Sequence, residues 1–360
     1  MTAVLLVVGL VVLVLGGELL VRGGSGLGRS FGLPPLVVGL TIVAFATSTP
    51  ELAVSVDASL SGSPGLAVGN VVGSNIVNVL LVLGLAALVL PIAVRSQLVK
   101  LDVPIMVAIS VLLLVLSLDG SVSRLDGALL LLLAVGYVAL SIVVGLREGA
   151  KADDAADDAG EGPPRLPVSL ALVVVGVALL VLGARALVSG ATTLAESFGV
   201  SELVIGLTVV AVGTSLPELA TSVIAALRGE RELAIGNIVG SNIMNIAAIM
   251  GLTAVVSPLG VPVEAAAVRF DMPVMVVVAI ALVPVVFTGF VIARWEAAVF
   301  LAFYVAYVAY LLLAAADHSA LPAFSNIMLL FVAPLTVLTL TVLTAYEVRL
   351  HRRRTAAPSG

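Results

Sequence analysis

The chain has 360 residues, of which 61% are hydrophobic and only 11% are charged, and its formal net charge is −5. Because soluble domains carry about 25% charged residues, this composition excludes a soluble globular protein and indicates one that crosses a membrane several times. The chain contains no cysteine, which excludes disulfide and thiol chemistry for it.

Apolar stretches of about 20 residues, long enough to span a bilayer as a helix, recur along the whole chain. They predict an all-α polytopic membrane protein with eleven spans, at residues 3–22, 36–60, 66–93, 99–118, 125–146, 167–190, 203–227, 233–256, 270–287, 293–315 and 327–346. The first stretch lacks the basic start of a signal peptide and is interpreted as a span. The acidic segment after the fifth span predicts a flexible linker. The predicted parts are a first repeat at 1–146, a linker at 147–166, a second repeat at 167–315 and an added helix with a basic tail at 316–360.

The second and third spans recur in the second half of the chain. GLTIVAFATSTPELAVSV from Gly39 matches GLTVVAVGTSLPELATSV from Gly206, and GNVVGSNIVNVLLVLGL from Gly69 matches GNIVGSNIMNIAAIMGL from Gly236. Every matched pair lies 167 positions apart without a gap. Since each half holds five spans, the second copy must enter the membrane from the opposite side. This arrangement predicts two inverted five-helix repeats, typical of a duplicated transporter.

Lysine and arginine are distributed unequally between alternate loops. If the N-terminus lies outside, fourteen of them fall in the inside loops and the C-terminal tail, and only Arg124 and Arg269 fall in outside loops. Because positive residues concentrate on the cytoplasmic side, we expect the N-terminus outside and the C-terminus in the cytoplasm. The excess of arginine over lysine, fifteen to two, favours a GC-rich prokaryotic genome, so the expected location is a prokaryotic cell membrane.

The repeated Thr-Ser-x-Pro-Glu motif places oxygen-bearing side chains on one helix face. Thr47, Glu51 and Ser55 recur every four residues. The second copy repeats this face with Thr214, Glu218 and Ser222. Pro50 lacks an N–H group and leaves a carbonyl free in the preceding turn, which a membrane helix tolerates where that oxygen faces protein, water or a cation. Carboxylate, hydroxyl and carbonyl oxygens suit Ca²⁺ and Na⁺ better than zinc or copper.

The following span of each copy carries a second polar face. Asn70, Ser74 and Asn78 recur every four residues, and Gly69 and Gly73 form a pair that allows close helix approach. The second copy repeats these positions with Asn237, Ser241, Asn245, Gly236 and Gly240. The four polar helices are therefore expected to meet near the membrane midplane, with Glu51 opposite Glu218.

Each of these residue types alone is more often structural, because a single serine or threonine usually bonds its own backbone. Burying two glutamates is different, since each costs about 2.5 kcal/mol or more in a membrane. Neither motif holds a cationic side chain, so a mobile cation is expected to supply the charge. Asp57, Glu18 and Arg185 are expected to lie at helix ends or to form pairs. His318 and His351 lie outside the repeats, so no catalytic site is expected.

Both copies closely resemble the α-repeats of the Ca²⁺/cation antiporter superfamily, in particular prokaryotic sodium/calcium exchangers. The resemblance covers residues 3–315 and implies a ten-helix core with four cation sites at the repeat interface. It implies Ca²⁺ and Na⁺ as transported ions, no cofactor, no nucleic-acid partner, and transport by a single chain in the bilayer. The ligands that it implies are Glu51, Glu218, Thr47, Thr214, Ser48, Ser215, Ser74 and Ser241, the carbonyls of Ala44 and Ala211, and Asn78 and Asn245 at the centre.

Asn245 stands where some archaeal and potassium-dependent relatives carry an aspartate, which argues against potassium dependence. Ala46 replaces the glycine usual before the first Thr-Ser pair, and the eleventh span is an addition. The leading hypothesis is electrogenic Na⁺/Ca²⁺ antiport that expels Ca²⁺, with an H⁺/Ca²⁺ antiporter or a K⁺-dependent Na⁺/Ca²⁺ exchanger as alternatives. A channel is disfavoured because a single-chain inverted repeat with broken helices is typical of alternating access. A membrane hydrolase is least favoured, since no nucleophile has a base beside it.

Overall fold

The computed structural model describes residues 2–153, 166–198, 209, 211–287, 289–316, 318–339 and 341. Within these residues the chain is nearly all helical, which confirms the predicted class. Nine described helices are long and apolar enough to cross a membrane, and the broken pair Pro35–Thr47 and Thr49–Leu60 adds a tenth span. Of the predicted seventh span at 203–227, most of the part before residue 211 lies outside the described residues.

The first repeat contains five spans in chain order. The first span is α1 (Thr2–Phe31). The second is broken and consists of α2 (Pro35–Val38), η1 (Gly39–Val43), α3 (Ala44–Thr47) and α4 (Thr49–Leu60). The third consists of α5 (Pro64–Val77), η2 (Asn78–Leu83) and α6 (Gly84–Val89), the fourth of η3 (Leu98–Asp102) and α7 (Val103–Leu116), and the fifth is α8 (Arg124–Asp153). The elements written η are π-helical turns. Short strands β1 (Ile92–Ala93) and β2 (Ser121–Val122) flank the fourth span.

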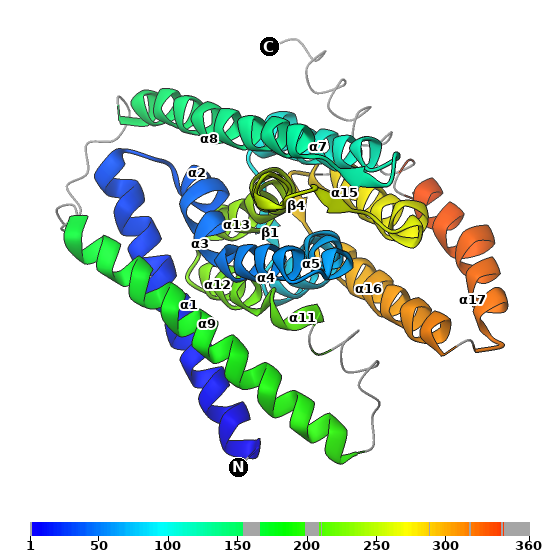
Figure 1. Cartoon of the computed structure of the whole chain (residues 1–360). Coiled ribbons are helices and arrows are strands. Elements are labelled where there is room, and N and C mark those ends of the chain that lie inside the picture. The colour runs from blue at the N-terminus through cyan, green and yellow to red at the C-terminus, as the bar shows by residue number, and fades with distance from the viewer. Residues whose placement is uncertain are drawn as a thin grey trace, which may run out of the picture.

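The second repeat follows the same order. It contains α9 (Leu166–Ser197), α11 (Ala211–Gly213) and α12 (Leu216–Leu227), then α13 (Arg231–Met244), η5 (Asn245–Met250) and α14 (Gly251–Val256), then η6 (Ala267–Asp271) and α15 (Met272–Phe287), and finally α16 (Arg294–Ala315). Strands β3 (Val261–Pro262) and β4 (Val291–Ile292) flank its fourth span. The added helix begins with α17 (Leu321–Ile327) and η7 (Met328–Val332) and lies at the edge of the bundle beyond α16 (Figure 1).

Several helices are longer than hydropathy predicted. α1 continues to Phe31 instead of ending near residue 22, α8 to Asp153 instead of 146, and α9 to Ser197 instead of 190. The extensions of α8 and α9 contain alanine, glutamate and other good helix formers that are not hydrophobic. Of the predicted linker at 147–166, the part up to residue 153 continues α8, and residues 154–165 lie outside the described residues.

Two short antiparallel ladders join loops of the two repeats. The first ladder aligns Ile92 with Ile292 and Ala93 with Val291, and the second aligns Ser121 with Pro262 and Val122 with Val261. Two arginines bind the ends of helices in the other repeat with the same symmetry. Arg124 Nε donates to the Val255 carbonyl of α14 at 3.0 Å, and Arg294 Nε donates to the Leu88 carbonyl of α6 at 3.1 Å. β1 and β2 lie at opposite ends of α7, so the ladders mark opposite faces of the protein, here named the β1/β4 face and the β2/β3 face.

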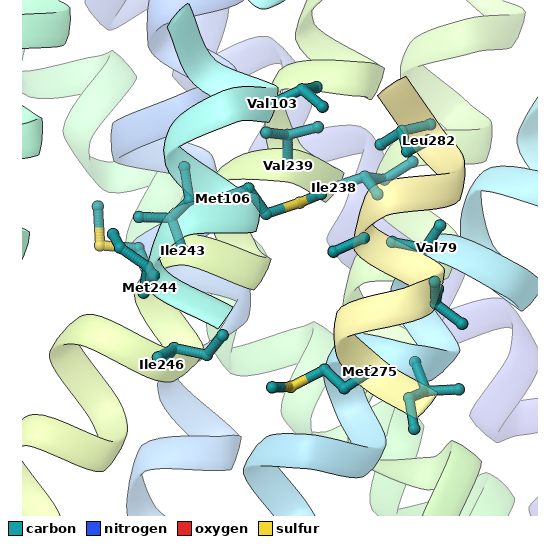
Figure 2. Close-up of a cluster of buried hydrophobic side chains, with 14 of the residues drawn as sticks. Val79, Val103, Met106, Ile238, Val239, Ile243, Met244, Ile246, Met275 and Leu282 are labelled. Atoms are coloured by element: carbon teal, nitrogen blue, oxygen red, sulfur yellow. The ribbon is translucent and has the colours of Figure 1, made fainter. Parts of the chain in front are cut away.

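Helices α1 and α9 cross along one side of the bundle in close contact (Figure 1). Glycines permit this approach, since a Cβ at Gly16 would lie 2.6 Å from the Leu180 nitrogen. The main apolar core lies elsewhere, between α7, α13, α15 and η2, where residues such as Met106, Ile238 and Met275 interlock (Figure 2). Residues from both repeats build this core, which therefore fixes the helices that carry the repeated polar motifs.

Candidate cation site at the repeat interface

The second and seventh spans both break inside the Thr-Ser-x-Pro-Glu motif. In the second span the two parts are bent by 43° at Ser48. Ser48 has φ −83° and ψ 6°, and Ser215 in the other copy has φ −89° and ψ 6°. The proline that follows stands in the first turn of a new half-helix, where its missing N–H group costs nothing. Glu51 and Glu218 lie in that first turn, where the helix dipole favours a carboxylate.

The third and eighth spans change to a π-helical turn at the predicted central asparagines. η2 begins at Asn78 and η5 begins at Asn245. Both side chains are fully buried, and none of their amide nitrogen or oxygen atoms has a hydrogen-bond partner. Single π-helical turns inside α-helices are frequent at functional sites because they redirect side chains and loosen the backbone ladder. The sequence predicted the asparagines but not this change of helix type.

Hydrogen bonds join the broken helix of the first repeat to the second repeat. Ser48 Oγ donates to Glu218 Oε1 at 3.2 Å. Thr47 Oγ1 lies 3.1 Å from Asn237 Oδ1 and 3.4 Å from Ser241 Oγ. All five side chains are buried, with exposed fractions of 2% or less. The motifs of the two copies therefore meet at one site, although they are far apart in the sequence.

By the repeat symmetry, the counterpart of the Ser48–Glu218 bond would join Ser215 to Glu51, but these two side chains are not hydrogen-bonded. Both carboxylate oxygens of Glu51 are buried without a partner, as are the hydroxyls of Ser215 and Ser74 and the second carboxylate oxygen of Glu218. Burying polar atoms without partners costs free energy, and a buried charge costs most. Carboxylate, hydroxyl and amide oxygens are the ligands that hard ions such as Ca²⁺ and Na⁺ prefer, so the chemistry of this cluster fits such ions.

Three predicted site residues differ from the rest. The Ala44 carbonyl already accepts the Ser48 N–H at 3.0 Å and lies 3.3 Å from Thr47 Oγ1, so its lone pairs have protein partners. Thr214 is half-buried, whereas its counterpart Thr47 is buried. Ala211 is the first residue of α11 in the seventh span.

Two asparagines support the site from behind. Asn70 Nδ2 donates to Ser55 Oγ at 2.9 Å and to the Glu51 carbonyl at 3.0 Å. In the second repeat, Asn237 Nδ2 donates to Ser222 Oγ, also at 2.9 Å. The sequence placed both asparagines on the polar helix face but did not reveal their role. They hold each carboxylate-bearing half-helix against its neighbour within the same repeat.

The predicted close approach at the glycine pairs is confirmed in one repeat. A Cβ at Gly236 would lie 2.6 Å from the Leu36 carbonyl, so α13 packs directly on the backbone of α2 and η1. At Gly69 and Gly73 a Cβ would meet no described atom within 4 Å. The repeat equivalents of Leu36, Gly39 and Leu40, at positions 203, 206 and 207, lie outside the described residues, so the close approach stays a prediction there. The close approach in the second repeat lies toward the β1/β4 face, where α2 and α13 begin.

Two inverted copies of a broken helix, which meet at buried carboxylates and hydroxyls inside a membrane bundle, define a secondary ion transporter. The family model described as sodium/calcium exchanger protein matches residues 1–143 and 168–313. The chain belongs to this family of antiporters, and it is not an enzyme.

Individual relatives agree with the family match. The inner membrane protein YrbG of Escherichia coli (strain K12) is 40% identical over 258 residues, which are 71% of this chain and 79% of that protein. The sodium/calcium exchanger MaX1 of Methanosarcina acetivorans is 36% identical over 353 residues, with 84% and 96% coverage. A solved structure of the sodium-calcium exchanger NCX_Mj, soaked with zero Na⁺ and Ca²⁺, superposes with a TM-score of 0.73 at 32% identity and covers 86% of this chain and 98% of that one.

Proposed function

We propose that the chain exchanges Na⁺ for Ca²⁺ by alternating access. The observation that carries this proposal is the pair of fully buried carboxylates, Glu51 and Glu218, among hydroxyl and amide oxygens with no protein partner. Only a cation or a proton can compensate such charges at this depth. MaX1 and NCX_Mj, which are similar over most of the chain, are sodium/calcium exchangers.

We propose the following ligands for the transported ions. The carboxylates of Glu51 and Glu218 carry the charge, and neutral oxygens complete the shells. The neutral set comprises Thr47, Thr214, Ser48, Ser215, Ser74, Ser241, Asn78, Asn245 and the carbonyls of Ala44 and Ala211. One Ca²⁺ takes about six to eight oxygens, so this set exceeds what one Ca²⁺ needs and leaves neutral oxygens for monovalent ions. The two repeats at 1–146 and 167–315 each supply half of it.

The exchange is electrogenic if more than two Na⁺ are exchanged for one Ca²⁺. Ca²⁺ neutralises the two carboxylates, whereas more than two Na⁺ would leave the loaded site positive. We place the N-terminus outside and the C-terminus in the cytoplasm, because arginine and lysine concentrate in the loops of the β1/β4 face. The membrane potential, about 2.3 kcal/mol per charge per 100 mV, then helps to drive Ca²⁺ out of the cell.

The test is Ca²⁺ flux in proteoliposomes under imposed Na⁺, K⁺ or H⁺ gradients, with the potential clamped by valinomycin and K⁺. We expect Ca²⁺ uptake that requires an outward Na⁺ gradient and that responds to the clamped potential. Ca²⁺ flux that depends on neither the Na⁺ gradient nor the clamped potential, but follows a pH gradient, would assign the chain to the proton-coupled alternative. Flux that requires K⁺ on the Ca²⁺ side would assign it to the potassium-dependent class.

A further inference from the structure

Charged side chains tie α1 to the turn between α12 and α13, away from the cation site. Arg228, which follows α12, donates two N–H groups to the Glu18 carboxylate in α1, with Nε 2.6 Å from Oε2. Arg22 binds the same carboxylate at 2.7 Å. Ser25, two turns along α1 from Glu18, donates to Glu230 at the start of α13. Of the expected possibilities for Glu18, a helix end or an ion pair, the structure shows the ion pair, and Arg228 belongs to the other repeat.

The opposite face of the protein lacks this cluster. The repeat equivalence of 167 positions relates Glu18 to Arg185 and Arg228 to Ser61, so no ion pair can form between the equivalent positions. It also relates Ser25 to Thr192 and Glu230 to Ser63. In the described part of the chain, Arg185 has no ion pair. The two faces are therefore chemically unequal at this point.

Helix packing shows the same inequality. α1 packs along α12, where a Cβ at Gly17 would lie 2.7 Å from Ile224 Cδ1. By symmetry, α9 would pack along α4, but the described residues show no comparable packing between these two helices. An inverted-repeat transporter reaches its other access state when each repeat takes the conformation of the other. In that state α1 leaves α12, and the bonds of Glu18 and Ser25 to the α12–α13 turn must separate.

We propose that the Glu18–Arg228 pair, with Ser25–Glu230 beside it, is a latch that stabilises the state closed on the β1/β4 face. The latch lies at that face, where α13 also packs directly on α2 and η1. Because no equivalent pair forms on the other face, the latch stabilises only the state closed on the β1/β4 face and shifts the equilibrium between the two access states toward it. This inference rests on the alternating-access part of the proposed function, but not on the identity of the coupling ion.

The size of the effect follows from exposure. The side chain of Glu18 is 26% exposed and that of Arg228 is 32% exposed, so solvent screens their attraction. A pair of this kind changes a conformational ratio by about two- to fivefold. High salt on the β1/β4 face is expected to weaken the latch, because mobile ions screen partly exposed charges.

The test uses Ile224→Cys as a reporter in this otherwise cysteine-free chain, because Ile224 is half-buried against α1. The rate of its reaction with a membrane-impermeant thiol reagent added on the β1/β4 face reports how often α1 leaves α12. We expect Glu18→Gln and Arg228→Gln to raise this rate about two- to fivefold. The matched control Arg185→Gln removes a positive charge from α9 but keeps the pair, and it should leave the rate unchanged.

A second measurement tests the latch by a reversible cross-link, in case the neutralising substitutions change the thiol rate by altering helix packing. Glu18→Cys combined with Arg228→Cys, bridged by a reducible bifunctional thiol reagent, should block Ca²⁺ exchange until a reductant is added. Unchanged thiol rates in both neutralised variants, or undiminished exchange by the bridged protein, would overturn the latch. The thiol rate needs neither a gradient nor a transported ion. A finding of proton coupling in the flux assay would therefore refute the Na⁺ assignment and leave the latch standing.

Discussion

Replacing Glu51 by glutamine should stabilise the ion-free protein and abolish its stabilisation by Ca²⁺. Both Glu51 carboxylate oxygens are buried without a partner. Leaving a buried charge uncompensated typically costs about 3–5 kcal/mol, whereas an unpartnered neutral amide costs about 1–3 kcal/mol. Relative to the ionised carboxylate, Glu51→Gln should therefore gain about 2 kcal/mol without ions.

The equivalent substitution at Glu218 should gain much less. The Ser48 hydroxyl donates to Glu218 Oε1 at 3.2 Å, and a hydrogen bond to a charged group contributes about 1.5–3 kcal/mol. Removing that charge also weakens this bond, so the expected gain is near zero. The structure thus separates two residues that the repeated motif makes equivalent.

Thermal unfolding in detergent, with EGTA or with excess Ca²⁺, measures both effects. Wild-type protein at a Ca²⁺ concentration 100 times Kd should gain about 2.7 kcal/mol, and the Glu51→Gln variant should show no Ca²⁺ shift. Asp57→Asn is the matched control, because Asp57 lies on the same helix and is exposed. If Glu51→Gln lowered the ion-free midpoint and kept the Ca²⁺ shift, Glu51 would not be a cation ligand.

Three further outcomes are expected. Glu51→Gln or Glu218→Gln should each abolish Ca²⁺ flux in proteoliposomes while the protein stays folded, and near-wild-type flux in either variant would contradict the ligand assignment. Thr47→Val removes the hydroxyl that reaches the second repeat and should weaken apparent ion affinity about tenfold, equivalent to about 1.4 kcal/mol, in the same flux assay. Cysteines placed at Thr2 and Ser359 should react with an impermeant reagent from opposite sides of the membrane, and labelling from one side would refute the predicted topology.

The repeated motifs made most of the site predictable. Identical spacing at Thr47–Glu51 and Thr214–Glu218 leads to the same helix break in both copies, because proline and the bend at the preceding serine are local properties of the chain. The inverted arrangement followed from counting five spans per half. Each of these inferences needed only short-range sequence or simple periodicity.

Other features depend on contacts between distant segments and could not be read from the sequence. The ladder of β1 with β4 joins residues 92–93 to 291–292, and neither strand has a partner nearby in the chain. The π-helical turns at Asn78 and Asn245 depend on how neighbouring helices pack, because local propensity does not favour them. The pairing of Glu18 with Arg228 likewise required knowing that α1 lies on α12.

The inequality of the two halves of the site is the feature that matters most for transport. Both copies carry the same serine, glutamate and asparagine, yet the Ser48 hydroxyl bonds Glu218, whereas the Ser215 hydroxyl and the Glu51 carboxylate have no partners. Two identical halves related by an axis in the membrane plane, if they also had identical conformations, would be equally open or equally closed to both sides. A carrier that opens to one side at a time must therefore hold its repeats in different conformations. Ser48 bonded to Glu218 is one of these conformations, and under the proposed function a cation takes the place of the missing bonds at the carboxylate of Glu51.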